Sequence, residues 1–290
     1  MTLARSDVSR EASWTPPPHA TPDARPQTLD DACATDTAHD PWSTYWNTLP
    51  FRGELCRLEA EDFVARLATV VALQPKWRVL DFGCGFGTIT ALLAPAVGEM
   101  CAWDPSPSMR AWAQRNAGDR ANVQIVEASS DRRLVGDAEP YDLIVVNSVI
   151  QYMSARERRL WLCRWRDLLA PGGRIVLSDL VSPRQHVWDD VASLCRFYAQ
   201  HGRLTDVLRQ RLRDLGLYWR ARRTYRLSSV GREELRRDAA AAGLAMQLLA
   251  TNLTAITRGA DGILLPPKGS VRPRVRRPAA KRVAARKARR

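Results

Sequence analysis

A glycine-rich turn between an apolar strand and a helix is the segment of this sequence best suited to chemistry. It runs from Val79 to Thr88 and reads VLDFGCGFGT. Glycines let the backbone turn tightly and let a ligand approach the main chain, while the start of the next helix offers N–H donors. Asp104 ends the following apolar run, where an acid would accept hydrogen bonds from ribose hydroxyls. These residues predict a nucleoside-binding crevice.

The spacing of the glycines argues against a dinucleotide. The fingerprint G-x-G-x-x-G would use Gly83 and Gly85 and would place a third glycine at position 88. Thr88 stands there instead, and Gly87 comes one residue early. The later sequence also lacks the cluster of catalytic residues typical of the second domain of a dehydrogenase. We therefore expect a different nucleoside cofactor.

Four segments, in this order and spacing, resemble the class I (Rossmann-like) S-adenosylmethionine-dependent methyltransferases, in particular the small-molecule branch called methyltransferase type 11 or 12. They are VLDFGCGFGT (79–88), AWDPSPSM (102–109), YDLIVVNSVIQYM (141–153) and LLAPGGRIVLSDL (168–180). The resemblance covers about residues 41–265. It implies an enzyme that binds S-adenosylmethionine and transfers its methyl group to the O, N or C atom of a small-molecule acceptor.

The resemblance also assigns cofactor-binding residues by position. They are Asp81, Gly83, Cys84, Gly85, Asp104, Pro105, Ser106, Met109, Ser129, Asn147 and Ser148. Asp81, Gly83 and Gly85 would lie near the methionine portion, and Asp104 would meet the ribose diol. The stretch from Pro105 to Met109 would lie beside the adenine, and Asn147 and Ser148 would face the methyl group. The acid that usually contacts the adenine amino group is replaced by Ser129, or is displaced to Glu127 or Asp131.

Methyl transfer is an in-line displacement at an already activated carbon, so alignment and desolvation are the main tasks of the protein. A base helps only if the acceptor is a hydroxyl or an amine, and the candidates are His186, His201 and Tyr152. Both histidines also adjoin predicted helix ends, where a solvated cap residue is the commoner role. Aromatic residues at 42, 45 and 46 either cover the sulfonium through cation–π contact or anchor an N-terminal helix.

The elements that position these residues alternate between short apolar strands and amphipathic helices. Five strands are predicted at Arg78–Phe82, Met100–Trp103, Val123–Val126, Leu143–Val146 and Arg174–Leu180, the last after a turn at 171–173. Two weaker strands are predicted near 244–250 and 262–265. The predicted fold class is therefore α/β, a Rossmann-like seven-stranded mostly parallel sheet with helices on both faces.

A helical insertion after the fifth strand, residues 183–225, is predicted from two apolar stripes at helical spacing. We interpret it as a lid over the acceptor, although ordinary packing of amphipathic helices also explains its aromatic residues. It contains nine Arg and four Asp, which is compatible either with an anionic acceptor or with a solvated helix face. A further helix is expected from Ser229, as N-cap, to Gly243.

The two ends of the chain differ in composition from the methyltransferase domain at 41–265. Residues 1–40 are rich in proline and are predicted to be a disordered leader. Residues 266–290 contain 11 Lys and Arg and no Asp or Glu, which predicts a basic disordered tail. Weak contact of this tail with nucleic acid or anionic lipid is one interpretation. The absence of interleaved aromatic residues favours a tail that is simply solvated.

Three features of the sequence bear on cellular location and on metal binding. Charged residues interrupt any signal-peptide pattern near the N-terminus, and the longest nearly apolar stretch, 239–250, is too short to span a bilayer. We expect a soluble, cytoplasmic protein without a membrane span. The six cysteines form no C-x-x-C pair, so we expect reduced thiols and no metal site.

Two rival functions stay open at this point. An RNA or other nucleic-acid methyltransferase would use the basic tail, but base-amino methylation usually requires Asn/Asp-Pro-Pro-aromatic, where this chain has NSVI at 147–150. A catalytically inactive S-adenosylmethionine-binding protein would keep the same motifs.

Overall fold

The computed structural model describes residues 53–126, 139–180, 187–209, 228–254 and 261–267. All of these residues belong to the compact unit that spans residues 37–290. The predicted leader at 1–40, and the predicted tail beyond residue 267, lie outside the described residues. The proposed domain boundaries therefore stay predictions.

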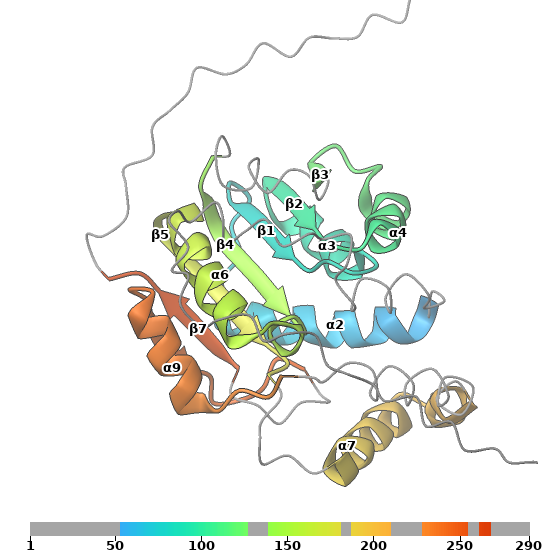
Figure 1. Cartoon of the computed structure of the whole chain (residues 1–290). Helices are drawn as coiled ribbons and strands as arrows, with labels where there is room; N and C mark the ends of the chain where they lie inside the picture. The colour runs from blue at the N-terminus through green and yellow to red at the C-terminus, as the bar shows by residue number, and fades with distance from the viewer. Residues whose placement is uncertain (1–52, 127–138, 181–186, 210–227, 255–260, 268–290) are drawn as a thin grey trace, which may run out of the picture. The chain divides into compact units, whose positions relative to one another are not determined.

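Seven strands form one sheet in the order β3-β2-β1-β4-β5-β7-β6 (Figure 1). Strands β1 to β5 pair in parallel, whereas β7 runs antiparallel to both β5 and β6. The strands are β1 (Arg78–Phe82), β2 (Glu99–Trp103), β3 (Val123–Val126), β4 (Tyr141–Asn147), β5 (Leu169–Ser178), β6 (Ala245–Leu248) and β7 (Gly262–Leu265). This architecture confirms the predicted α/β fold with a mostly parallel sheet.

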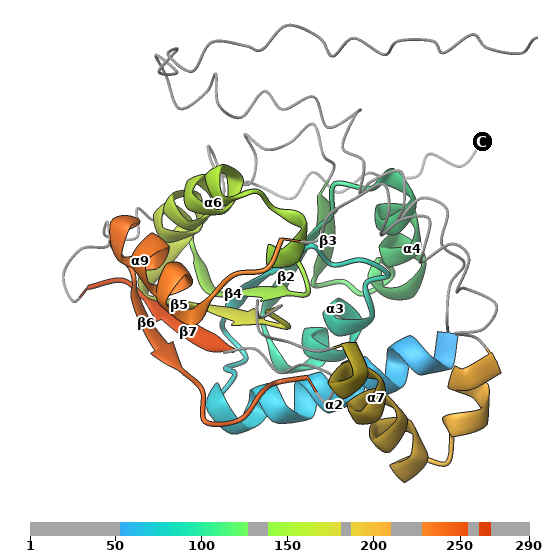
Figure 2. The ribbon, with the colours of Figure 1, turned by 60° about the horizontal axis from the view of Figure 1, so that its bottom comes forward.

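Helices cover both faces of the sheet, as predicted. Among the described residues they are α2 (Gly53–Val70), α3 (Thr88–Leu93), α4 (Pro107–Ala117), α6 (Ala155–Leu168), α7 (Val187–Gln200) and α9 (Arg232–Ala241), with 3-10 turns η2 (Ala94–Ala96) and η4 (Ile150–Tyr152). Side chains of α6 and α9 share one buried cluster with Leu80 and Ile144. Side chains of α2 and α3 share another with Val79 and Val145. Figure 2 shows α2 and α6 on opposite sides of the sheet. Successive residues of β1 and β4 thus point into opposite cores, which is why the middles of these two strands are mostly apolar.

Two local predictions differ from the structure. The strand predicted to begin at Arg174 begins at Leu169, because the turn at 171–173 is a bulge inside β5: its pairing passes from Tyr141↔Leu169 to Leu143↔Arg174. The expectation that Ser229 caps the next helix is wrong, since Gly231 holds that position. Val230 is buried in the core, and the neighbouring Ser228 N–H donates to the carbonyl of Gln151, so the chain stays extended until Gly231.

The described part of the insertion is helical, as its apolar stripes predicted. Helix α7 and the helical residues 204–209 pack on the start of α2. The apolar contact joins Leu55 to Phe197 and Val207. The Tyr198 hydroxyl donates to Glu59 Oε1 at 2.5 Å. These contacts attach the described part of the insertion to α2, which covers one face of the sheet.

Candidate cofactor and acceptor site

The carboxyl ends of the parallel strands bring most of the predicted site residues to one edge of the sheet. Asp104 follows β2, Ser148 follows β4 and Asp179 follows β5, while the glycine-rich turn follows β1. The strand order reverses between β1 and β4, and ligands of open α/β sheets bind at that switch point. The side chain of Val149, just after β4, lies against Gly83. The turn and the end of β4 therefore form adjacent parts of one site.

The glycine-rich turn is held by its own N–H groups. Gly83 N–H and Cys84 N–H both donate to the Trp103 carbonyl, at 2.7 and 3.0 Å. Gly85 N–H donates to Asp104 Oδ2 at 2.9 Å, and Gly87 N–H donates to the Cys84 carbonyl at 2.8 Å. Four N–H groups of the turn are thus engaged within the protein, and the donors at the start of α3 are separate from them.

The hydrogen bonds of the turn bear on whether it would bind a pyrophosphate or a cationic group. A pyrophosphate needs several N–H groups directed at its oxygens, and the four N–H groups above have other partners. What the turn carries instead is negative charge, from Asp81 and Asp104. A cationic group is the better match for such surroundings.

Space for a ligand lies above the middle glycine. Gly83, Gly85 and Gly87 all have positive φ, at 78, 52 and 73°. A Cβ on Gly83 would overlap Val149 Cγ2, and one on Gly87 would lie 2.7 Å from Ala113 Cα. A Cβ on Gly85 would meet nothing within 4 Å. Gly85 therefore borders an open cradle, whereas the other two glycines are required by close packing.

Asp104 links the turn after β1 to the turn after β2. Its carboxylate is buried, and Oδ1 accepts the Ser106 N–H at 2.8 Å while Oδ2 accepts the Gly85 N–H. Arg110 Nη1 donates to the Asp104 main-chain carbonyl at 2.7 Å. Each carboxylate oxygen can accept more than one hydrogen bond. The geometry is compatible with the predicted contact to a ribose hydroxyl, which stays a prediction.

Asp81 is the most buried acid beside the turn, at 2% exposure. Thr90 Oγ1 donates to its Oδ2 at 2.6 Å. Burial raises the pKa of Asp81 to about 6, and the negative charge of Asp104 adds to the effect, although the Thr90 hydrogen bond opposes it. A cation bound nearby would favour the ionised form of this carboxyl.

Other predicted cofactor residues have structural contacts of their own. The Ser106 hydroxyl caps α4 by accepting the Met109 N–H at 3.2 Å, and both side chains are buried. Pro105, which precedes Ser106 in the sequence, is half-buried. The Cys84 thiol is buried, which raises its pKa well above the ordinary value and keeps it neutral. Ser129, like Glu127 and Asp131, lies outside the described residues, and contact of this group with adenine stays a prediction.

The ends of β4 and β5 form the second half of the site. Asn147 Oδ1 accepts the Ser178 hydroxyl at 2.7 Å, and the Ser148 hydroxyl donates to the Asp179 carboxylate. Ser148 and Asp179 both have positive φ, at 58 and 60°. Such a backbone costs an L-residue roughly 1–2 kcal/mol and persists where the surroundings enforce it, often at functional sites.

Asp179 is the residue that the sequence analysis overlooked, because the run Arg174–Leu180 was assigned wholly to a strand. β5 ends at Ser178, so Asp179 follows it as Asp104 follows β2. The rule used for Asp104, an acid after an apolar strand, would have found it. Asp179 N–H donates to Asp261 Oδ1 at 3.1 Å, and burial raises the pKa of Asp261 to about 6.

Of the three predicted bases, the structure describes His201 and Tyr152. His201 lies exposed at the end of α7, with Nδ1 2.8 Å from the Phe197 carbonyl, which is the geometry of a helix-end contact. Tyr152 ends η4, shortly after β4, and is half-buried. His186 and the three aromatic residues at 42, 45 and 46 lie outside the described residues. Catalytic roles for these side chains stay predictions.

Metal and membrane features were sought over the described ranges. Within them, no three His, Cys, Asp or Glu side chains are grouped as a metal site. Cys56, Cys84, Cys101, Cys163 and Cys195, the cysteines of the described ranges, form no disulfide bonds. None of the helices in these ranges has the length and apolar character needed to cross a bilayer.

Comparison with known proteins agrees with this geometry. A family model described as "Methyltransferase domain" matches residues 79–173, from β1 to the bulge of β5. The chain is 35% identical over 157 residues to a trans-aconitate 2-methyltransferase of Streptomyces avermitilis, covering 52% of this chain and 56% of the relative. It is 31% identical over 154 residues to the Streptomyces coelicolor enzyme of the same name, covering 51% and 48%. The chain thus matches about half the length of these curated relatives.

Solved structures with a similar arrangement include a methyltransferase of calicheamicin biosynthesis in its S-adenosylhomocysteine-bound form. That similarity has a TM-score of 0.48 and 16% identity, and covers 72% of this chain and 54% of the other. Magnesium protoporphyrin IX methyltransferase from Synechocystis, with bound S-adenosylmethionine, has a TM-score of 0.45 and 16% identity, and covers 81% and 92%.

Proposed function

Because this chain belongs to the class I S-adenosylmethionine-dependent methyltransferases, we propose that it transfers the methyl group of S-adenosylmethionine to a small-molecule acceptor. The observation that carries the proposal is the turn after β1. Its N–H groups at Gly83, Cys84 and Gly85 are engaged within the protein, and it carries two buried carboxyls beside an open cradle. That combination suits a cationic nucleoside and does not suit a phosphate.

The residues present fit this cofactor at three points. The open space over Gly85 admits a ligand against the main chain. Asp104, just after β2, would accept from ribose hydroxyls, and Asp81 would compensate the positive charge of the methionine portion. Val149, after β4, adjoins Gly83, and Val149 and the preceding Ser148 would border the methyl group.

When bound, the cofactor would supply an electrophilic methyl carbon with a neutral thioether as its leaving group. The protein's own residues then have to hold the acceptor in line and receive its proton where it has one. We assign the second task to Asp179. The Ser148 hydroxyl and the Asp261 carboxylate fix this side chain and its backbone at the end of β5. An acceptor hydroxyl or amine would pass its proton to the Asp179 carboxylate as the new bond forms.

A direct assay separates the three candidate functions. Calorimetry with S-adenosylmethionine comes first, followed by transfer of radiolabelled methyl to a metabolite extract, to RNA and to trans-aconitate, the acceptor named for two relatives. We expect binding and a labelled small molecule. Binding without any labelled product would identify an inactive binding protein, and label in RNA alone would favour the nucleic-acid reading. Asp104→Ala is expected to weaken cofactor binding about tenfold or more, since hydrogen bonds to charged groups contribute roughly 1.5–3 kcal/mol.

The role of Asp179 is tested by Asp179→Asn, which keeps the shape and one acceptor oxygen. We expect the turnover number to fall at least about a hundredfold, as for a lost general base, while the dissociation constant of S-adenosylmethionine changes less than about twofold. With an acceptor that is already ionised in solution, the turnover number should fall much less, because no proton has to be removed. Equal losses for both kinds of acceptor would show that Asp179 only supports the fold.

A further inference from the structure

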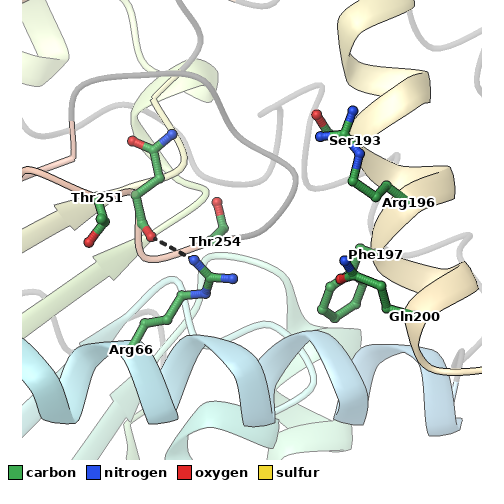
Figure 3. Close-up of a pocket in the computed structure, with 8 residues that line it drawn as sticks. Arg66, Ser193, Arg196, Phe197, Gln200, Thr251 and Thr254 are labelled. Atoms are coloured by element: carbon green, nitrogen blue, oxygen red, sulfur yellow. Dashed lines mark hydrogen bonds between the residues drawn. The ribbon is translucent and has the colours of Figure 1, made fainter.

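A second cavity of about 370 Å³ lies between α2, α7 and the segment after β6. Figure 3 shows Arg66 rising from α2 on one side, with Arg196 and Phe197 of α7 on the other. The polar residues around it are Arg66, Ser193, Arg196, Gln200, Thr251, Asn252 and Thr254. We call this cavity the Arg66–Arg196 pocket. None of the described residues that line it is acidic.

Arg66 is oriented by contacts that leave it directed at the pocket. Its Nε donates to Asp62 Oδ2 at 2.8 Å, one turn earlier on α2, and Nη1 reaches the Asn252 carbonyl at 3.4 Å, the dashed line in Figure 3. Asp62 is not among the lining residues. The Asp62 contact uses Nε and the Asn252 contact uses one hydrogen of Nη1, so neither printed contact uses Nη2 or the second hydrogen of Nη1. A guanidinium held this way is pre-organised to donate two parallel hydrogen bonds to an oxyanion.

The pocket adjoins the acceptor half of the site through a shared buried carboxyl. Leu253 N–H, in the wall at 251–254, donates to Asp261 Oδ2 at 2.6 Å. The other oxygen of Asp261 accepts the Asp179 N–H at 3.1 Å. Asp261 therefore fixes the pocket wall and the proposed base relative to each other. A molecule anchored in the pocket would be held at a defined position with respect to the end of β5.

We propose that the Arg66–Arg196 pocket binds an oxyanionic group, carboxylate or phosphate, of the methyl acceptor and so orients the acceptor toward Asp179. This inference rests on the proposed methyl transfer. Two guanidinium groups supply the charge, and the hydroxyls of Ser193, Thr251 and Thr254 supply neutral donors. The volume matches a small metabolite, since ligand pockets start at about 300 Å³. The acceptor is accordingly a small anion rather than a neutral or cationic molecule.

The test uses the full chain saturated with S-adenosylhomocysteine. Calorimetry measures the dissociation constants of tricarballylate, inorganic phosphate and the neutral trimethyl ester of tricarballylate. We expect an anion to bind with 1:1 stoichiometry and the ester to bind at least tenfold more weakly. Tighter binding of tricarballylate assigns a carboxylate, and tighter binding of phosphate assigns a phosphate.

Variants locate the binding. Arg66→Met and Arg196→Met keep the apolar stems and should each raise the dissociation constant of the anion tenfold or more. Arg57→Met is the matched control, because Arg57 is an exposed arginine of α2 with an equivalent partner, Glu61, one turn away; it should change the constant less than twofold. Unchanged affinity in both pocket variants, equal binding of the ester, or no binding of either anion would overturn the pocket assignment. Wild-type protein that binds the anion but not S-adenosylmethionine would instead sink the proposed function.

Discussion

Asp81 is a carboxyl group whose ionised form the fold disfavours. Thr90 donates to it from both the hydroxyl and the main chain, and it lies beside a second acid, Asp104, in a buried setting. A ligand-free protein that keeps such a charge at neutral pH is less stable than one without it. A bound cation would offset this loss of stability, so the Asp81 carboxylate lowers the stability of the ligand-free protein and raises its affinity for a cationic ligand.

The first prediction concerns the free energy of unfolding as pH changes. The folded pKa of Asp81, about 6, lies above its ordinary value of 3.8. Between about pH 4 and pH 6 the folded chain keeps a proton that the unfolded chain has lost, so stability falls as the pH rises through this window. The full cost, on the order of 3 kcal/mol, is present above pH 6. Asp81→Asn removes the charge, keeps an oxygen for Thr90, and should stabilise the ligand-free protein at pH 7.5.

Urea denaturation of both proteins at pH 5 and pH 7.5 measures this effect. Asp261, with a raised pKa in the same range, contributes a similar slope that persists in the variant, so only the difference between the two proteins reports on Asp81. The same variant should bind S-adenosylmethionine more weakly. A variant that is less stable than wild type at pH 7.5 would contradict the assignment of a destabilising charge.

The second prediction compares two glycines with similar backbones. Gly85 and Gly172 both have positive φ, and a Cβ on either meets nothing within 4 Å. Gly85→Ala and Gly172→Ala should therefore each cost about 1 kcal/mol of stability through backbone strain. Only Gly85→Ala places a methyl group in the proposed cofactor cradle, so it alone should weaken S-adenosylmethionine binding, by tenfold or more in a calorimetric titration. Equal affinities for the two variants would place the cofactor elsewhere.

Helices α6 and α9, which cover one face of the sheet, are joined by a network of ion pairs. Arg158, 1% exposed, donates to Asp238 Oδ2 through Nε at 2.9 Å and Nη2 at 2.6 Å, and its Nη2 also reaches Glu234 at 2.5 Å. Arg159, 60% exposed, donates to the other oxygen of Asp238 at 2.8 Å. The network fixes α9 against α6, and α9 in turn leads directly into β6 at the edge of the sheet.

These two arginines give the third prediction, since they are neighbours with one shared partner and opposite exposure. Arg158→Met breaks a buried pair and should lower the free energy of unfolding by about 3 kcal/mol or more, because it strips charge compensation from a buried carboxylate. Arg159→Met should lower it by less than about 1 kcal/mol, because water screens an exposed pair. Thermal or chemical denaturation measures both. Similar losses would mean that Asp238 is hydrated in solution.

For the molecule as a whole, the positive charge is concentrated at one end of the sequence. The formal net charge is +13, and 11 Lys and Arg lie between residues 268 and 290. The candidate cofactor site and the Arg66–Arg196 pocket are both built from residues 66–261. The basic segment at 268–290 therefore contributes no residue to the candidate cofactor site or to the Arg66–Arg196 pocket.

The fourth prediction is that deletion of residues 268–290 leaves methyl transfer intact. The dissociation constant of S-adenosylmethionine and the turnover of a small acceptor should change less than about twofold. Retention on heparin should drop to a lower salt concentration, because polyanion binding follows the number of cations that neutralise it. Loss of methyl transfer on deletion, with an unchanged far-ultraviolet circular dichroism spectrum, would assign the tail a part in catalysis.

The sequence by itself determined the fold and the place of the cofactor turn. Parallel strands that are buried on both faces are mostly apolar, so runs such as Leu143–Val146 could be predicted as strands from the sequence alone. Gly83 to Gly87 and Asp104 were legible for a related reason: each directly follows such a strand, and the carboxyl ends of parallel strands share one edge. These inferences need only neighbours along the chain.

Only the tertiary structure decided how distant residues share partners. The turn donors Gly83 and Cys84 are paired with Trp103 across a strand, which excludes them from a ligand. Asp261 reaches Asp179 because β7 inserts between β5 and β6, an arrangement that no local pattern encodes. Arg66 and Arg196 face one cavity because α7 packs on α2. Apolar periodicity specifies which face of a helix is buried, but the partner of that face is set by packing of the whole chain.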